Sequence, residues 1–298
     1  MLQSIPCRTA AVLSDIHSNY HAFRACFDDA VSQGADCFLF LGDYISDFAD
    51  PVKTLELVYE IRANYPTVCL RGNRERYIRE HAAGGFPFFP GSKTGSLLYT
   101  FRQLRQKDLA FFESIPIADT AVINGIPMEI AHAASQDDRY YFESGDAQIS
   151  TVFAQMQCPW LLTGHSHKQY VAGHAGKTIL NPGSVGVPRD HGPLSQYALL
   201  HFRDDTVLPQ FRQIPYDIAA TIHSQFESGL ASLAPHWAVS VLYDAITGEE
   251  CTMHLLSLVD DVLSEESWHS AAAALGMTFT EHEIMHFLMH QKEYGESL

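Results

Sequence analysis

A short apolar segment that ends abruptly in a polar loop recurs along the chain, and this repetition constrains the fold more than any other feature. In the first instance, residues 10–13 (Ala-Ala-Val-Leu) lead into a loop that carries Asp15 and His17. Such an apolar run, bounded by polar residues, predicts a buried strand. Four later segments end in the same way: residues 37–41 lead to Asp43, 67–70 to Asn73, 126–130 to His132, and 160–163 to His165 and His167. Each predicted strand therefore presents metal-binding types of side chain at its carboxyl end.

The order of the predicted elements indicates an α/β fold with mixed sheets. In the first half, strands alternate with helical segments such as residues 20–33, and this order implies parallel strands joined by crossover helices. The pair Asn124-Gly125 between two apolar segments then predicts a β-hairpin, so antiparallel strands follow. Residues 196–202 and 207–213 alternate in polarity, which predicts edge strands.

The strand-containing domain is expected to span residues 1–216, and residues 217–298 are expected to form a separate helical region. Five helices are predicted there, over residues 218–233, 236–245, 251–263, 265–275 and 281–291. Two of them carry apolar residues at helical spacing: Ile222, Phe226, Leu230 and Leu233 in one, and Leu255, Leu258, Val259 and Val262 in the other. Such faces need a packing partner. We therefore expect a helical cap over the core or a dimerisation region.

The helical region contains a pattern that imitates a catalytic motif. His282, Glu283 and His286 match the His-Glu-x-x-His pattern of zinc proteases, and His290 extends the stripe. Glu283 is also the expected capping-box partner of Thr280. We interpret the stripe as a polar helix face and not as a catalytic zinc site.

Composition limits the classes of partner and the compartment. With 298 residues and 46% hydrophobic content the chain can bury a large core. The chain has no segment of 18 apolar residues and no signal-peptide pattern at its start, so we expect a cytoplasmic protein without membrane contact. The net charge is −16, and from residue 204 onward 15 Asp and Glu residues face only Arg212 and Lys292. This acidity disfavours nucleic acid as a partner.

The polar residues that follow the five strands are types that bind metal ions. They are Asp15, His17, Asp43, Asn73, His132, His165 and His167. Seven donors exceed the three or four protein ligands that one ion usually takes, so we expect two divalent ions that share a carboxylate. Imidazole and carboxylate without thiolate suit Mn, Fe, Zn or Ni, and the sequence does not choose among them. Two cations roughly 3.5–4 Å apart would hold a phosphoryl oxygen and lower the pKa of a bridging water.

The order of the motifs resembles that of the calcineurin-like metallophosphoesterase superfamily. The matching motifs are Asp15-x-His17, Gly42-Asp43, Gly72-Asn73-x-Glu75, an isolated His132, and Gly164-His165-x-His167. The resemblance covers about residues 8–216, and residues 181–186 resemble the small bacterial phosphodiesterase branch. It implies a four-layer αββα sandwich of two mixed sheets. It also implies that Asp15, His17 and His167 hold one ion, that Asn73, His132 and His165 hold the other, and that Asp43 bridges them.

Arg74 departs from the pattern of this family. Many members have a histidine there, which the resemblance implies as the proton donor to the leaving group. An arginine stays charged and is a poor general acid, although it binds phosphate oxygens well. We take Arg74 and His132 as candidate catalytic residues, and Asn19, Asn73 and Arg74 as candidate substrate-binding residues. For Asn19 the alternative is that it stabilises its own loop.

Other polar residues carry weaker predictions. Asp47, four residues after Asp43, is expected to cap a helix or lie in solvent and not to orient a catalytic group. His81, Arg189 and His191 are expected to be solvated more readily than to approach the site.

These features predict a dinuclear metal-dependent phosphoesterase that hydrolyses small phosphomonoesters or phosphodiesters, nucleotides included, by attack of a metal-bridging hydroxide. Two alternatives stay open. One is a protein or dinucleoside-polyphosphate phosphatase, which Arg74 disfavours mildly. The other is a non-catalytic metal-binding scaffold that acts through its helical tail, which the seven filled ligand positions disfavour. The expected partners are a small phosphate ester and, through the C-terminal helices, a second copy of the chain.

Overall fold

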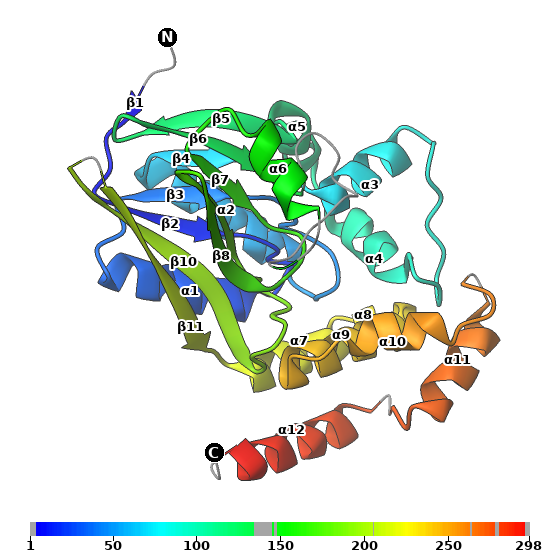
Figure 1. Cartoon of the computed structure of the whole chain (residues 1–298). Helices are drawn as coiled ribbons and strands as arrows, with labels where there is room; N and C mark the ends of the chain where they lie inside the picture. Colours follow the sequence, from blue (N-terminus) through cyan, green and yellow to red (C-terminus); the bar gives the residue numbers. More distant parts are fainter. Residues whose placement is uncertain are drawn as a thin grey trace.

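Two β-sheets lie face to face and helices cover their outer sides (Figure 1). The computed structural model describes residues 4–133, 145, 148–204, 206–262, 264–277 and 280–295. One apolar cluster joins the inner faces of the sheets, with Val12 and Leu39 on one side and Met128 and Leu162 on the other. The four-layer αββα arrangement implied by the family resemblance is confirmed.

The five-stranded sheet holds the first three predicted strands, in the order β11-β10-β2-β3-β4. Its parallel members are β2 (Thr9–Leu13), β3 (Cys37–Phe40) and β4 (Thr67–Cys69). The antiparallel members are β10 (Leu194–Arg203), which pairs with β2, and β11 (Thr206–Pro215). The prediction that both late strands lie at edges is wrong for β10, because it pairs with a strand on each side and most of its residues are buried.

The six-stranded sheet contains the predicted hairpin. Its strands, in spatial order, are β1 (Ser4–Ile5), β5 (Ala118–Ile123), β6 (Ile126–Ala131), β7 (Trp160–Thr163), β9 (Lys177–Pro182) and β8 (Gln169–His174). Asn124 and Gly125 both have positive φ, 48° and 84°, as the tight turn between β5 and β6 requires. The strands β1 and β8 are additions that the sequence analysis did not predict.

Helices α1 (Tyr20–Ser32) and α2 (Pro51–Asn64) cover the outer face of the five-stranded sheet, and α6 (Ile149–Gln155) covers that of the six-stranded sheet. Helices α3 (Asn73–Ala82), α4 (Gly95–Gln103) and α5 (Gln106–Ser114) follow β4. In β2, Ala11 and Leu13 lie in the apolar cluster formed with α1 and α2, whereas Ala10 and Val12 face the six-stranded sheet. Burial on both faces explains why β2 reads as a continuous apolar run.

The C-terminal helices lie together along one side of the molecule, coloured yellow to red in Figure 1. They are α7 (Ile218–Glu227), α8 (Leu230–Leu233), α9 (Pro235–Thr247), α10 (Cys251–Ser257), α11 (Glu265–Ala274) and α12 (Glu281–Gly295). The predicted helix over 218–233 is wrong at its middle, because Gly229 takes φ 83° and separates α7 from α8. The helix predicted over 251–263 ends already at Ser257, and residue 263 lies outside the described residues.

The C-terminal helices pack on the loops of the sandwich. Phe48 and Val187, from two such loops, share an apolar cluster with Ile222, Trp237 and Trp268 of the helical region. The predicted boundary at residue 216 falls between β11 and α7. Among the described helices, none combines the length and the apolar character needed to cross a bilayer.

Candidate metal centre

The structure brings the seven predicted ligands together from five loops that follow β2, β3, β4, β6 and β7. Among these seven residues, two groups of three have ligand atoms that all lie within 4.8 Å of one another. The first group is Asp15, His17 and His167, and the second is Asp43, His132 and His165. Asn73 joins the second group through its Oδ1, which lies 3.2 Å from His132 Nε2.

In the first group the ligand atoms converge on a small space. His17 Nε2 and His167 Nε2 lie 3.1 Å apart, and they lie 3.7 Å and 3.3 Å from Asp15 Oδ1. All three side chains have little or no contact with solvent. Asp15 Oδ1 is buried and accepts no hydrogen bond from the described part of the chain. An oxygen left without a donor at a buried site is costly unless a ligand completes it.

The second group lies next to the first and shares its carboxylates. His132 Nε2 lies 3.5 Å from Asp43 Oδ2 and 3.2 Å from His165 Nδ1. Asp43 Oδ2 also lies 3.9 Å from His17 Nε2, and Asp15 Oδ1 lies 4.0 Å from His132 Nε2. Both aspartates therefore reach toward both groups, which is the geometry that a carboxylate shared between two ions requires.

The histidine tautomers are set by bonds that point away from the centre. His132 Nδ1 lies 2.8 Å from the carbonyl oxygen of Leu41, and His167 Nδ1 lies 2.8 Å from that of Val187. A carbonyl oxygen can only accept, so each Nδ1 carries the proton, and the neutral ring presents an Nε2 lone pair to the site. Lone pairs and carboxylates that face one another at these distances repel unless a cation lies between them. The donor set therefore fits divalent cations.

The electrostatic field favours positive charge at the same place. Burial acts to lower the pKa of His17 and of His132, but the surrounding carboxylates raise these pKa values to about 9 and about 10. Burial acts to raise the pKa of Asp43, but the charge of His132 lowers it to about 2. Protons and metal ions compete for these same lone pairs, so metal binding should release protons.

The ligand loops hold their side chains in uncommon backbone conformations. Five of the seven predicted ligands have φ between 53° and 67°: Asp15, His17, Asp43, His165 and His167. A left-handed conformation is rare for residues other than Gly, Asn and Asp, and it persists only where the surroundings impose it. Here the loops hold one another, since the Asp15 and His17 amides donate to the carbonyl oxygens of Gly42 and Asp43.

Glu75 and two glycines fix the approach of the Asp43 loop to the Asn73 loop. A Cβ on Gly42 would lie 2.5 Å from the Gly72 nitrogen, and a Cβ on Gly72 would lie 2.1 Å from Asp43 Oδ1, so only glycine fits at both positions. The buried Glu75 carboxylate accepts hydrogen bonds from the amides of Gly72, Asp43 and Tyr44 at 2.9–3.0 Å. Burial, together with the charge of Asp43, raises the pKa of Glu75 to about 7.

Asp47 belongs to the site, and the expectation that it caps a helix or lies in solvent is wrong. Its side chain is 3% exposed. Its Oδ2 lies 2.9 Å from His17 Nδ1 and 3.0 Å from Arg74 Nη2, while its Oδ1 accepts a hydrogen bond from the Trp237 indole at 2.8 Å. These partners lower its pKa against the effect of burial. The signal in the sequence was a second aspartate four residues after Asp43, but a spacing alone could not reveal its burial.

Arg74 lies at the edge of the second group. Its backbone amide donates to Asp43 Oδ1 at 2.8 Å, and its Nε lies 3.9 Å from Asp43 Oδ2. That Nε forms no hydrogen bond with the described residues. The nearby carboxylates raise its pKa further, against the effect of burial, so the guanidinium is always charged. Arg74 can therefore offer a charged donor to an anion bound beside Asp43.

Asn19 lies outside the two groups. It is 1% exposed, its Oδ1 accepts from the Ala22 amide and the Thr221 hydroxyl, and its Nδ2 donates to the carbonyl oxygen of Gly186. Of the two roles predicted for Asn19, these contacts are those of loop stabilisation. Substrate contact by Asn19 stays a prediction.

Of the more weakly predicted residues, Arg189 lies beside the ligand loops. Its amide donates to the His167 carbonyl oxygen, and its guanidinium bonds to the carbonyl oxygen of Ser166 and to Glu250. His81 is instead bound to the carbonyl oxygen of Phe86 and stacks on Phe88. The structure gives no contact between His191 and the predicted ligands among the residues that it describes.

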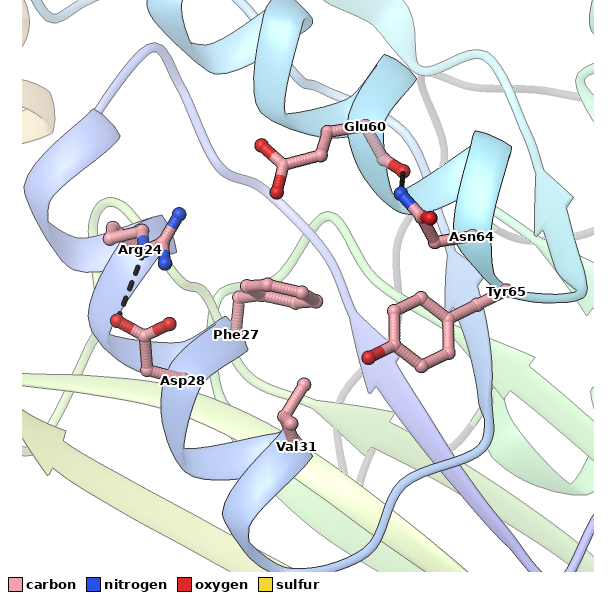
Figure 2. Close-up of a pocket in the computed structure, with 7 residues that line it drawn as sticks. All are labelled: Arg24, Phe27, Asp28, Val31, Glu60, Asn64 and Tyr65. Atoms are coloured by element: carbon pink, nitrogen blue, oxygen red, sulfur yellow. Dashed lines mark hydrogen bonds and ion pairs between the residues drawn. The ribbon is translucent and has the colours of Figure 1, made fainter.

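Two hollows of the surface lie away from the ligand loops. The one in Figure 2, about 600 Å³, lies between α1 and α2, with Phe27, Val31 and Tyr65 around its floor and the Arg24–Asp28 ion pair at its rim. It contains none of the predicted ligands.

A second hollow, of about 480 Å³, lies beside the histidine stripe of α12. His282, His286 and His290 are exposed there, and they form no metal-binding group within the described part of the chain. The Glu283 amide donates to the Thr280 hydroxyl, as expected of a helix cap.

The sequence of the chain was compared with known protein families and proteins. The family model described as "calcineurin-like phosphoesterase superfamily domain" matches residues 9–205, which include all seven predicted ligands. An uncharacterized protein of Methanocaldococcus jannaschii is 24% identical over 242 residues, which cover 76% of this chain and 94% of that protein.

Two solved structures share the fold. A metallophosphoesterase from Sphaerobacter thermophilus superposes with a TM-score of 0.62 at 24% identity, over 80% of this chain and 100% of that one. A hypothetical protein from Pyrococcus horikoshii superposes with a TM-score of 0.65 at 17% identity, over 83% of this chain and 100% of that one.

Proposed function

The chain belongs to the calcineurin-like phosphoesterase superfamily and is a metal-dependent phosphoester hydrolase, and from this premise we propose that it hydrolyses small phosphomonoesters or phosphodiesters, nucleotides included, at a two-metal centre. Asp15, His17 and His167 would hold one divalent cation. Asp43, His132 and His165, with Asn73, would hold the other. The observation that carries the proposal is the convergence of two adjacent donor groups whose carboxylates reach toward both.

When bound, such cations would polarise the phosphoryl group and make water acidic enough to supply a nucleophile near neutral pH. The residues of the chain contribute binding and orientation. Glu75 and the glycines keep the Asp43 and Asn73 loops in contact. The carbonyl oxygens of Leu41 and Val187 fix the ring orientation of His132 and His167, so no rearrangement is needed when a ligand binds.

Arg74 is the proposed phosphate-binding residue. Its charged guanidinium lies at the edge of the Asp43 group and would neutralise charge on a phosphate oxygen. It cannot act as a general acid at any working pH. The preferred substrates should therefore have acidic leaving groups, as aryl phosphates do.

The direct test is hydrolysis of nitrophenyl phosphate and bis-nitrophenyl phosphate with Mn²⁺. The purified protein should turn over at least one of them and lose this activity with a chelator. Asp43→Ala and His132→Ala should abolish it, whereas the control His174→Ala should not, because His174 is an exposed residue at the end of β8. Activity that survives chelation in the wild type, or that survives in both ligand variants, contradicts the proposal.

Two further measurements sharpen the assignment. Elemental analysis of the protein as purified identifies which of Mn, Fe, Zn or Ni it carries and whether the stoichiometry approaches two. A panel that adds phosphopeptides and dinucleoside polyphosphates tests the alternative of a protein or dinucleoside-polyphosphate phosphatase. Faster turnover of either class than of simple aryl esters would favour that alternative.

A further inference from the structure

The carboxylate of Asp47 is a meeting point for four separate parts of the chain. Its Oδ2 lies 2.9 Å from His17 Nδ1, in the loop after β2, and 3.0 Å from Arg74 Nη2, at the start of α3. Its Oδ1 accepts hydrogen bonds from the Ser96 hydroxyl of α4 at 3.2 Å and from the Trp237 indole of α9 at 2.8 Å. Oδ2 therefore contacts residues of the candidate metal centre, whereas Oδ1 accepts hydrogen bonds from residues outside that centre.

Trp237 is the partner that comes from the C-terminal helices. It lies in the first turns of α9, is 9% exposed, and packs edge-on against Trp268 of α11 with ring centroids 6.0 Å apart. The guanidinium carbon of Arg74 lies 5.9 Å from the centroid of its ring, within the range of a cation–π contact. Trp237 therefore touches both Asp47 and the proposed phosphate-binding residue.

The segment around Asp47 needs such support. Ser46 and Asp47 have φ of 82° and 69°, conformations that persist only where neighbours impose them. The C-terminal helices hold this segment at three points beyond the indole. Gln225 donates to the Asp47 carbonyl oxygen at 2.9 Å, Ser224 donates to the Asp50 carboxylate at 2.7 Å, and Phe48 packs in the same apolar cluster as Trp237.

We infer that Trp237 is a positioning residue of the metal centre: by holding Asp47, it fixes the orientation of His17 and of Arg74. The Asp47 carboxylate lies 2.9 Å from Nδ1 without hydrogen-bond geometry, and its negative charge favours a proton on that nitrogen, which leaves Nε2 free to bind a cation. The same carboxylate keeps the Arg74 guanidinium beside Asp43. The C-terminal helices are on this reasoning a working part of the site. The inference rests on the proposed two-metal site and adds to it a residue outside the residues matched by the family model.

The test is Trp237→Phe, which removes the indole donor and keeps a large aromatic ring. The matched control is Trp268→Phe, because the Trp268 indole donates to the carbonyl oxygen of Val262 at 3.0 Å in the same cluster but does not touch Asp47. The readout is the affinity of metal-free protein for Mn²⁺, measured by competition with a chelating dye. Loss of an outer partner of a ligating histidine typically weakens metal binding by 10–100-fold. Trp237 is one hydrogen bond further from the metal than such a partner, so for Trp237→Phe we expect about tenfold weaker binding of one of the two ions. For Trp268→Phe we expect no change in affinity.

Inhibition by inorganic phosphate gives an independent readout, since a displaced Arg74 should raise the inhibition constant and the KM more than it lowers kcat. Wild-type affinity for both ions in a folded Trp237→Phe protein overturns the inference, as does an equal loss in both tryptophan variants, which would indicate general destabilisation. If Trp237→Phe does not fold, Ser96→Ala decides by the same readouts, because it removes the other donor to the same oxygen. A wild-type protein that takes up none of Mn²⁺, Fe²⁺, Zn²⁺ and Ni²⁺ refutes the proposed function itself and is recognised before any variant is made.

Discussion

Replacement of Arg74 by histidine separates the two tasks that a residue at this position can perform. The guanidinium is always charged but cannot donate a proton to a leaving group. Its Nη2 lies 3.0 Å from Asp47 Oδ2, and its Nε lies 3.9 Å from Asp43 Oδ2. The family resemblance implies a proton-donating imidazole here, and Asp47 would keep such an imidazole protonated. Arg74→His should therefore exchange a strong phosphate ligand for a general acid.

The expected magnitudes differ for the two effects. Loss of a charged hydrogen bond to phosphate costs about 1.5–3 kcal/mol, or roughly 10–100-fold in kcat/KM, for every substrate alike. General acid catalysis contributes roughly 10²–10⁴-fold, but only where the leaving group needs a proton. In Arg74→His, kcat/KM for nitrophenyl phosphate should therefore fall. For phenyl phosphate, whose leaving group has a pKa of about 10, kcat/KM should stay the same or rise. The ratio of the two rates should shift by roughly 10²–10⁴ toward phenyl phosphate.

The assay is kcat/KM over a series of aryl phosphates with leaving groups of graded acidity. The wild type should depend steeply on leaving-group pKa, and Arg74→His should depend on it weakly. Arg74→Gln is the matched control, because it lacks both the charge and the acid and should lower all rates without changing the slope. A shallow slope in the wild type would refute the reasoning, since it would require a proton donor other than residue 74.

Three further variants test other parts of the structure. Glu75→Gln should lower the free energy of unfolding by about 1–3 kcal/mol and weaken Mn²⁺ binding, measured by urea unfolding and chelator competition, because an amide NH₂ would face backbone N–H donors. Asn19→Ala should cost about 1–2 kcal/mol of stability as a lost helix cap with KM unchanged, whereas a raised KM would support its predicted substrate contact. Burial raises the pKa of Asp244 from 3.8 to about 7, so the native state keeps a proton that the unfolded state releases, and stability falls as pH rises through that window. Asp244→Asn should therefore be up to about 3 kcal/mol more stable relative to wild type at pH 8 than at pH 5, measured by urea unfolding, and an unchanged difference would contradict this.

The convergence of the predicted ligands could be expected from the sequence because these residues follow buried strands. An apolar run marks a buried strand, and an Asp or His directly after it has no buried place unless it binds something. Parallel strands bring these ends to one edge within each sheet, and the face-to-face packing of the two sheets then lets Asp15, after β2, meet His167, after β7. The same reasoning yields the fold class, since it uses only periodicity and the order of the elements.

Partners that come from other parts of the chain were not predictable. Asp47 carries no local sign of burial, because the groups that surround it come from α3, α4 and α9. The predicted helix over 218–233 is interrupted because Gly229 adopts a left-handed conformation. A glycine allows this conformation but is also found within helices, so the sequence alone does not predict the break. The alternation of residues 196–202 predicts an edge strand, whereas the structure places a strand on each side of β10.

The apolar faces of the C-terminal helices bear on whether this region is a cap or a dimerisation element. Ile222 and Leu255 are fully buried in the cluster that contains Phe48 and Val187, and Leu230 packs against Ala49, so much of these faces packs within one chain, whereas Leu258 stays 43% exposed. The large apolar side chains left exposed in the described part of the C-terminal region are Met253, Leu258 and Met289. A stable dimer needs a contiguous surface of about 800 Å² per partner. We therefore propose the predicted cap rather than the predicted dimerisation region, and its packing explains why a helix outside the matched family domain can supply a hydrogen bond to a residue beside the predicted metal ligands.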